Sequence, residues 1–187
     1  MRMRTVQLLG LSGSLRASSV HDVILRTISE ELVPVDTRLV VHGLHEIPLY
    51  NEDLDGDGAK APEAVRRLRQ AVLEADGLVI GSPEYNHGMS GVMKNALDWL
   101  SRPHGQSVLK AKPVLTFTAS PAFTGGVRAQ QQLNETLWAI PVELVRYPQI
   151  VIGGVGSKIA QGRLVDDAVR QFLEKGLLEL RAMIPQL

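Results

Sequence analysis

The chain of 187 residues has no cysteine, few aromatic residues and no excess of charge of either sign. Without cysteine it has no disulfides, no thiolate nucleophile and no zinc or iron–sulfur centre held by cysteine. Lysine and arginine together number 20, as do aspartate and glutamate, so the net charge is zero. A neutral chain has no general attraction for nucleic acid or for an anionic membrane surface. The sequence therefore predicts neither of these as a partner.

Long apolar runs are also missing, and none approaches the roughly 20 residues that a membrane-spanning helix needs. The N-terminal stretch MRMRTVQLLGL has two arginines before an apolar run, as a signal peptide does. That run is short and contains Gln7, so a signal peptide is only the alternative, and the sequence predicts a cytoplasmic protein. Hydrophobic residues make up 44% of the chain, enough for a sizeable core. The length fits a single domain over residues 1–187.

What is present is an alternation of two patterns. Short apolar runs rich in Val, Leu and Ile are typical of buried strands, and longer segments with apolar residues three or four apart are typical of helices. The predicted strands are 5–11, 37–44, 76–81, 113–120 and 143–152. The predicted helices are 19–33, 61–75, 90–100, 125–140 and 163–183. Five strands alternating with helices predict an α/β fold whose parallel sheet is covered on both faces.

Three loops that follow predicted strands share an unusual content of serine and glycine. They read SGSLRASS at 12–19, SPEYNHG at 82–88 and SPAFTGG at 120–126. In parallel sheets of this kind, ligands bind beyond the carboxyl ends of the strands. We therefore expect the chemistry of the protein to lie in these loops.

The first loop has the composition of an anion site. It precedes a helix, whose N-terminus offers free N–H groups, and it supplies Arg16 and four hydroxyls, those of Ser12, Ser14, Ser18 and Ser19. The alternative is an ordinary turn in which one serine caps the helix. No lysine follows as in a P-loop, and the glycines do not form the dinucleotide fingerprint. The loop therefore suits a terminal monophosphate.

The second loop offers a surface for a flat ring. Tyr85 supplies an aromatic face, and the backbone between Pro83 and Gly88 can supply donors to the edge of a heteroaromatic ligand. The alternative is a proline-containing turn with a partly buried tyrosine. Taken alone, this stretch is weak support for a ligand.

The motifs GSLRASS at 13–19, PEYNHG at 83–88 and KNALDW at 94–99 together resemble the NADPH-dependent FMN reductase family, which includes bacterial quinone and chromate reductases. The segments IPLYNED at 47–53 and SPAFTGGVRAQQQL at 120–133 resemble further parts of that family. The resemblance covers nearly the whole chain in the same order. It implies a flavodoxin-like three-layer α/β sandwich, with a five-stranded parallel sheet in the order 2-1-3-4-5.

The resemblance also implies roles for individual residues. Those implied to hold the FMN phosphate are Ser12, Ser14, Arg16, Ser19, Val20 and His21. Those implied to line the isoalloxazine ring are Pro83, Glu84, Tyr85 and Asn86, with Ser120 approaching from the other side. Two positions depart from the family pattern. His21 stands where Asn is common and brings a titratable ring, and Ser90 stands where many members have Pro.

The activity implied by the resemblance is hydride transfer from NADPH or NADH, through FMN, to a small electron acceptor. Quinones come first, followed by chromate, azo compounds, ferric chelates and free flavin. No side chain need act as acid, base or nucleophile, and the chain is expected to form a homodimer or homotetramer. One alternative is a flavodoxin-type electron carrier, which the neutral charge and Arg16 disfavour. Another is a binding module for a different phosphorylated ligand.

Other polar residues have plainer interpretations. His87 and His104 are candidate proton donors, but a lone loop histidine is more often solvated. His42 and His45 have no partner cluster, so no metal site is predicted.

Arg66, Arg67 and Arg69 form a basic run, predicted to be a solvated helix face with an NADPH phosphate as the alternative. The acidic loop at 51–58 is predicted to be solvated as well. Lys94 and Asp98 form an i,i+4 pair, which with Asn95 is expected to support the structure.

Overall fold

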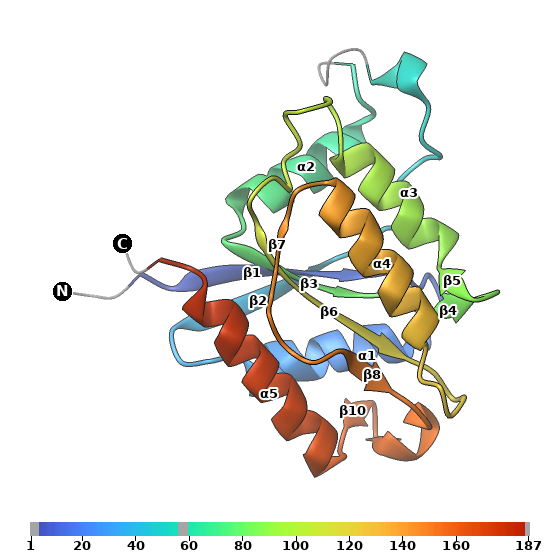
Figure 1. Ribbon diagram of the computed structural model, residues 1–187, viewed down its shortest axis with the longest axis vertical. Helices are drawn as coiled ribbons and strands as arrows, with labels where there is room; N and C mark the ends of the chain where they lie inside the picture. The colour runs from blue at the N-terminus through green and yellow to red at the C-terminus, as the bar shows by residue number, and fades with distance from the viewer. Residues whose placement is uncertain (1–3, 56–59, 186–187) are drawn as a thin grey trace.

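The computed structural model describes residues 4–55 and 60–185. Its main sheet is parallel and has the order β2-β1-β3-β6-β7, with β8 also paired to β6 (Figure 1). The strands are β1 (Val6–Ser12), β2 (Thr37–His42), β3 (Gly77–Gly81), β6 (Pro113–Ala119), β7 (Glu143–Leu144) and β8 (Ile150–Ile152). Because β6 is the fourth predicted strand, the predicted order 2-1-3-4-5 is confirmed.

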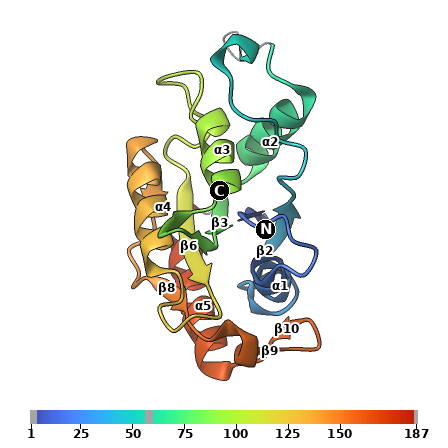
Figure 2. The same cartoon turned by 90° about the vertical axis from the view of Figure 1, so that its right-hand side faces the viewer.

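Helices cover both faces of this sheet (Figure 2). One face packs against α1 (Val20–Thr27) and α5 (Asp167–Ala182), and the other against α2 (Glu63–Glu74), α3 (Gly91–Leu100) and α4 (Val127–Ala139). Alternate residues of β1 enter different cores, since Leu8 joins the α1–α5 side and Leu9 the α2–α4 side. All five residues of β3 are buried, as expected for a strand covered on both faces.

Two predicted elements are each divided in the structure. The predicted strand 143–152 is two short strands, because β7 pairs with the start of β6 and β8 with its end. The chain leaves the sheet between them, around Pro148, which has no N–H for a strand ladder. The predicted helix 19–33 is α1 followed by one π-helical segment, η1 (Ile28–Leu32).

Short elements complete the fold. Before α5 the chain forms η4 (Val155–Lys158) and an antiparallel pair, β9 (Ile159–Ala160) with β10 (Arg163–Leu164). The last helix therefore begins at Asp167, later than predicted, where the Asp166 carboxylate accepts the Val169 N–H at 2.9 Å. A second antiparallel pair, β4 (Glu84–Tyr85) with β5 (Gly88–Met89), lies between β3 and α3.

The prediction that Arg66, Arg67 and Arg69 form a solvated basic face is wrong for one of the three. Arg66 and Arg67 are exposed as expected, but Arg69 is buried and forms a two-pronged ion pair with buried Asp55, at 2.8 and 3.0 Å. Arg69 also donates to the Trp99 carbonyl at 2.8 Å. The pair fastens the loop between β2 and α2, which includes η2 (Glu52–Leu54), to α2 and α3. The acidic loop predicted to be solvated at 51–58 is therefore buried at Asp55, and its residues 56–58 lie outside the described residues.

Asn95 fastens the same loop at another point. Its side chain accepts the Tyr50 N–H at 2.7 Å and donates to the Pro48 carbonyl at 2.8 Å, while the Trp99 indole donates to that carbonyl as well. Lys94 and Asp98 form their i,i+4 ion pair on the exposed side of α3. This part of α3 thus holds the long loop before α2 in place.

Candidate functional site

The carboxyl ends of β1, β3 and β6 bring the three serine- and glycine-rich loops to one edge of the sheet, the edge that Figure 2 faces. From β1 the chain proceeds to β2 on one side, and later strands are added on the other side from β3 onward. The order therefore reverses between β1 and β3. In open α/β sheets this reversal point is where ligands bind.

The first loop is folded around its own hydroxyl groups. Ser12 Oγ accepts the Ser14 N–H at 3.4 Å, and the Arg16 guanidinium donates to Ser18 Oγ at 3.4 Å. Ser19 is the N-cap of α1, where its Oγ accepts the Asp22 N–H at 3.2 Å. The hydroxyls of the loop are thus gathered at the start of the helix.

This donor set fits a phosphate group. Residues 12–20 contain hydroxyls and one guanidinium but no carboxylate, and Val20 is the first residue of the helix. The helix N-terminus adds a partial positive charge, which favours an anion. Arg16 is exposed, so its guanidinium is free to turn toward a bound anion.

The ring of His21 is buried between α1 and β6. It is 1% exposed, stacks on Phe117 at 5.6 Å, and accepts the Ala119 N–H on Nε2 at 3.2 Å. Burial lowers its pKa from 6.5 to about 4, although a hydrogen bond with the Ser82 backbone acts in the raising direction. The ring is therefore neutral at pH 7 and packs under the loops, against β6. Only the backbone N–H of His21 is then available to contact a phosphate.

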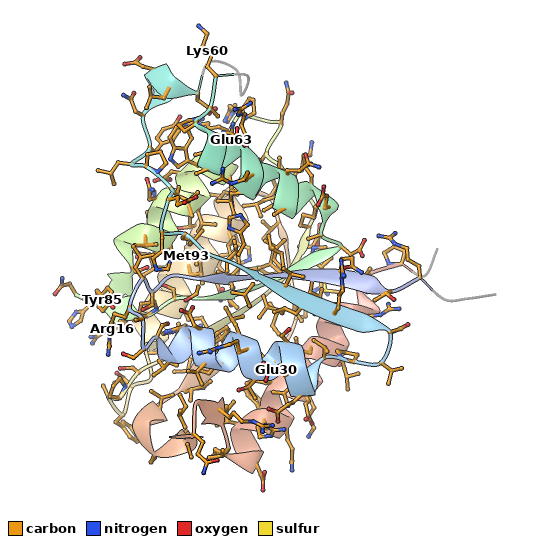
Figure 3. All side chains as sticks on the ribbon, turned by 180° about the vertical axis from the view of Figure 1, so that it is seen from behind. Arg16, Glu30, Lys60, Glu63, Tyr85 and Met93 are labelled. Atoms are coloured by element: carbon orange, nitrogen blue, oxygen red, sulfur yellow. The ribbon has the colours of Figure 1, made fainter. Side chains whose placement is uncertain are left out.

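The second loop is a tight hairpin made of β4 and β5. Its two turn residues, Asn86 and His87, have positive φ angles of 50° and 68°, the geometry of a type I′ turn. Pro83 is buried at its base, while Tyr85 is 50% exposed and Asn86 and His87 are exposed. Figure 3 shows Tyr85 and Arg16 at the same edge of the molecule. An aromatic face is thus presented beside the cationic loop.

Ser90 joins the first two loops, a role that the sequence did not predict. It is 1% exposed, its Oγ donates to the Gly13 carbonyl at 2.6 Å, and its N–H donates to Ser82 Oγ at 3.1 Å. A Cβ on Gly13 would lie 2.8 Å from Ser90 Oγ, so only glycine permits this approach. The sequence feature that could have identified Ser90 is a serine directly before a helix, because Ser90 caps α3 by accepting the Met93 N–H.

Glu84 and Gln132 join the hairpin to α4. The Glu84 carboxylate accepts the backbone N–H groups of Arg128 at 3.0 Å and Ala129 at 3.3 Å. Gln132 Oε1 accepts the Met89 N–H at 2.8 Å. The side chain of Glu84 is therefore directed at the helix, which leaves its backbone as the part available to a ring. Neither contact has a local sequence signal, because both partners are more than 40 positions away.

The third loop is fastened to the segment that follows β8. Ser120 donates its N–H to the Ile152 carbonyl at 3.0 Å, and its own carbonyl accepts the Val155 N–H at 3.1 Å. Its Oγ accepts the Ala122 N–H at 3.1 Å. Phe123, at the outer part of this loop, is 98% exposed. The loop is thus held at its base and presents a free aromatic side chain.

Of the two candidate proton donors, only His87 lies at this edge. Helix α3 starts beside the hairpin and runs back along the sheet, so His104, beyond its far end, lies away from the three loops (Figure 1). His104 instead lines a cavity of about 630 Å³ between α3 and α4. Across residues 4–55 and 60–185, no group of three or more His, Cys, Asp or Glu side chains is placed to hold a metal ion.

Fold and site together define a flavodoxin-like α/β protein with a phosphate-type loop and an aromatic hairpin at the carboxyl edge of its sheet. Residues 6–157 match the family described as NADPH-dependent FMN reductase, and the chain belongs to that family. This membership confirms the class of protein, an oxidoreductase that uses FMN and NAD(P)H, which the sequence motifs implied.

Relatives with curated functions point the same way. The chain is 38% identical over 183 residues to an NAD(P)H-dependent FMN reductase of Pseudomonas aeruginosa, covering 97% of each chain. It is 37% identical over 163 residues to a 2-hydroxy-1,4-benzoquinone reductase of a Burkholderia species, covering 87% of each. Among solved structures, it resembles a flavoenzyme NAD(P)H:acceptor oxidoreductase of Paracoccus denitrificans, with a TM-score of 0.81 and 28% identity, over 96% of this chain and 100% of that one.

Within the part of the chain that the structure describes, no helix combines the length and apolar character that crossing a bilayer requires.

Proposed function

We propose that this chain oxidises NADPH or NADH and passes the electrons through bound FMN to a quinone or a similar small acceptor. The observation that carries the proposal is the meeting of a carboxylate-free serine–arginine loop with the exposed Tyr85 hairpin at the reversal point of the sheet. The first suits a terminal phosphate and the second a flat ring, which are the two ends of FMN. The whole chain, 1–187, is proposed to act as one FMN-binding domain.

The residues of the first loop and the start of α1 bind the phosphate: Ser12, Ser14, Arg16, Ser19, Val20 and His21. Hydroxyls and backbone N–H groups supply the hydrogen bonds, and Arg16 supplies the charge. The neutral His21 ring keeps the start of α1 against Ala119, so this support does not change with pH around neutrality. The loop fixes one end of the cofactor.

The hairpin and the third loop orient the ring. Pro83, Glu84, Tyr85 and Asn86 line it from the side of β3, with backbone groups directed at its edge and Tyr85 against its surface. Ser120 borders it from the side of β6. FMN, when bound, supplies the capacity to accept a hydride and release two electrons. The protein contributes position and electrostatics, and no side chain is required as acid, base or nucleophile.

The acceptor is proposed to be a small planar oxidant, with quinones first and chromate, azo compounds, ferric chelates and free flavin after them. The exposure of Tyr85 and Phe123 supports an open site in which a nicotinamide and then an acceptor occupy the same place. The named relatives in Pseudomonas and Burkholderia support nicotinamide as donor and a quinone as acceptor.

The protein is further proposed to be cytoplasmic and to form a homodimer or homotetramer. Trp138 on α4 is 64% exposed, and tryptophan is enriched at interfaces between protein molecules. Light scattering coupled to gel filtration measures the state directly. A monomer at micromolar concentration would contradict this part of the proposal.

Anaerobic spectroscopy tests the activity. The purified protein is loaded with FMN and mixed in turn with NADPH and NADH, and the absorbance band of the oxidised flavin is followed. Rapid bleaching, restored by adding a benzoquinone, is the expected result, and the faster donor identifies the preferred coenzyme. Bound flavin that stays oxidised would instead indicate an electron carrier. Failure to bind FMN would overturn the site assignment.

A further inference from the structure

Glu84 caps a helix that is not its own. The N-cap position of α4 is Gly126, at φ 94°, which has no side chain to accept the N–H groups of the first turn. The Glu84 carboxylate, from the neighbouring hairpin, accepts the Arg128 and Ala129 N–H groups instead. Figure 1 shows the hairpin of β4 and β5 beside the start of α4. A negative charge is thus held at the positive end of a 13-residue helix.

The geometry fixes the sign of the charge that Glu84 and the start of α4 contribute together. A helix N-terminus is equivalent to about +0.5 elementary charge, and a carboxylate carries −1. With Glu84 in place the pair is therefore net negative by about half a charge, and without the carboxylate the same place is net positive by about half a charge. The side chain is half-buried, so solvent screens it only in part.

We infer that Glu84 sets the reduction potential of the bound cofactor, acting as a positioning and tuning residue whose side chain need not touch the ring. The inference rests on the proposed function. Hydride transfer takes two electrons and a proton from NAD(P)H, leaves NAD(P)⁺, and adds one negative charge to the ring. The Glu84 carboxylate opposes that added charge, which lowers the potential. It thereby favours passage of the electrons to the acceptor over their retention.

The substitution Glu84→Gln isolates the charge, because glutamine has nearly the same shape and keeps an oxygen that can accept the α4 N–H groups. The expected result is a higher midpoint potential, measured by reductive titration of the FMN-loaded protein against a reference dye. We expect the ratio of the dissociation constants for oxidised and reduced FMN to change about tenfold in favour of the reduced form. For a two-electron couple, tenfold corresponds to about 30 mV.

Glu135→Gln is the matched control. Glu135 is an exposed glutamate on the same helix, and at 1.5 Å per residue it lies about 10 Å farther along the axis than Arg128. Glu135→Gln removes the same unit of charge at a point farther along the helix that Glu84 caps, so both variants change the net charge of the protein equally. The midpoint potential of this variant is expected to equal that of the unmodified protein.

A second variant tests the sign of the shift in midpoint potential and leaves Glu84 unchanged. Val127 is the first residue of α4 and is 38% exposed, so Val127→Glu places an additional carboxylate at the same helix terminus, where glutamate is well tolerated. This variant is expected to lower the midpoint potential, opposite to Glu84→Gln. It gives a result even if Glu84→Gln does not fold.

The outcomes separate this inference from the proposed function. Unmodified protein that binds FMN and is bleached by NADPH, with potentials unmoved in both Glu84→Gln and Val127→Glu, would overturn the role of Glu84 and leave the function intact. Equal shifts of the midpoint potential in Glu84→Gln and Glu135→Gln would also overturn it, because the effect would then not depend on a charge at the N-terminus of α4. Unmodified protein that binds no FMN would overturn both.

Discussion

Removing the hydroxyl of Ser90 tests the link between the phosphate loop and the hairpin. In Ser90→Ala the N-cap of α3 is lost, which costs about 1 kcal/mol. The buried Gly13 carbonyl also loses its donor at 2.6 Å, and an unpaired buried polar group costs about 1–3 kcal/mol. Because Ser90 is 1% exposed, water cannot readily replace the hydroxyl. We expect the free energy of unfolding to fall by about 2–4 kcal/mol.

The assay is urea unfolding of the FMN-free protein, with the denaturant slope expected to stay unchanged. The same variant is expected to bind FMN about tenfold more weakly, a loss of about 1.4 kcal/mol, because the two loops are no longer held together. Ser101→Ala is the control. It removes a hydroxyl that donates to the Asp98 carbonyl at 2.7 Å at the other end of α3, and it should leave FMN affinity unchanged. A loss in stability below about 0.5 kcal/mol for Ser90→Ala would refute this reasoning, since even one hydrogen bond is worth that much.

Three further predictions concern charge. Arg16→Ala should weaken FMN binding at least tenfold, roughly the value of a charge-assisted contact, whereas Arg26→Ala at the far end of α1 should not; equal affinities in a fluorescence titration would remove Arg16 from the phosphate site. Asp55→Ala should reduce the free energy of unfolding by about 3–5 kcal/mol because it leaves buried Arg69 without its partner, and an unchanged melting temperature would contradict this. The low pKa of His21, about 4 against 6.5, means that the unfolded chain takes up the proton first as the pH falls. Stability should therefore be constant above about pH 6.5 and decline by up to about 3 kcal/mol toward pH 4, with a shallower decline in His21→Gln.

The parallel sheet and its two covering layers were predictable because they follow from local patterns. A run such as GLVIG at 77–81, apolar at every position, indicates a strand covered on both faces, and alternation with helices then restricts the sheet to parallel topologies. The meeting of the three loops followed from the same rule, since carboxyl ends of parallel strands share one edge. The family resemblance supplied the order of the strands and the name of the cofactor.

The destinations of polar side chains were not predictable in the same way. The Glu84 carboxylate accepts N–H groups of α4 and the His21 ring accepts the Ala119 N–H, and the sequence indicated neither contact. Arg69 was expected in solvent and is buried against Asp55. Each of these contacts is made with a partner distant in the sequence. Periodicity and spacing do not predict which distant backbone group or carboxylate a polar side chain will meet.

The interruption of the last strand has a consequence for how copies of the chain meet. A long, regular edge strand offers a row of free backbone groups on which another chain can form a sheet, and this is a common origin of aggregation. Here β7 and β8 are only two and three residues long, and the chain between them, which carries Pro148, leaves the sheet. This border is therefore a poor template for adding a strand from another molecule. We therefore expect copies of the chain to associate on that side through helix surfaces, where the shape of the side chains determines which partner fits.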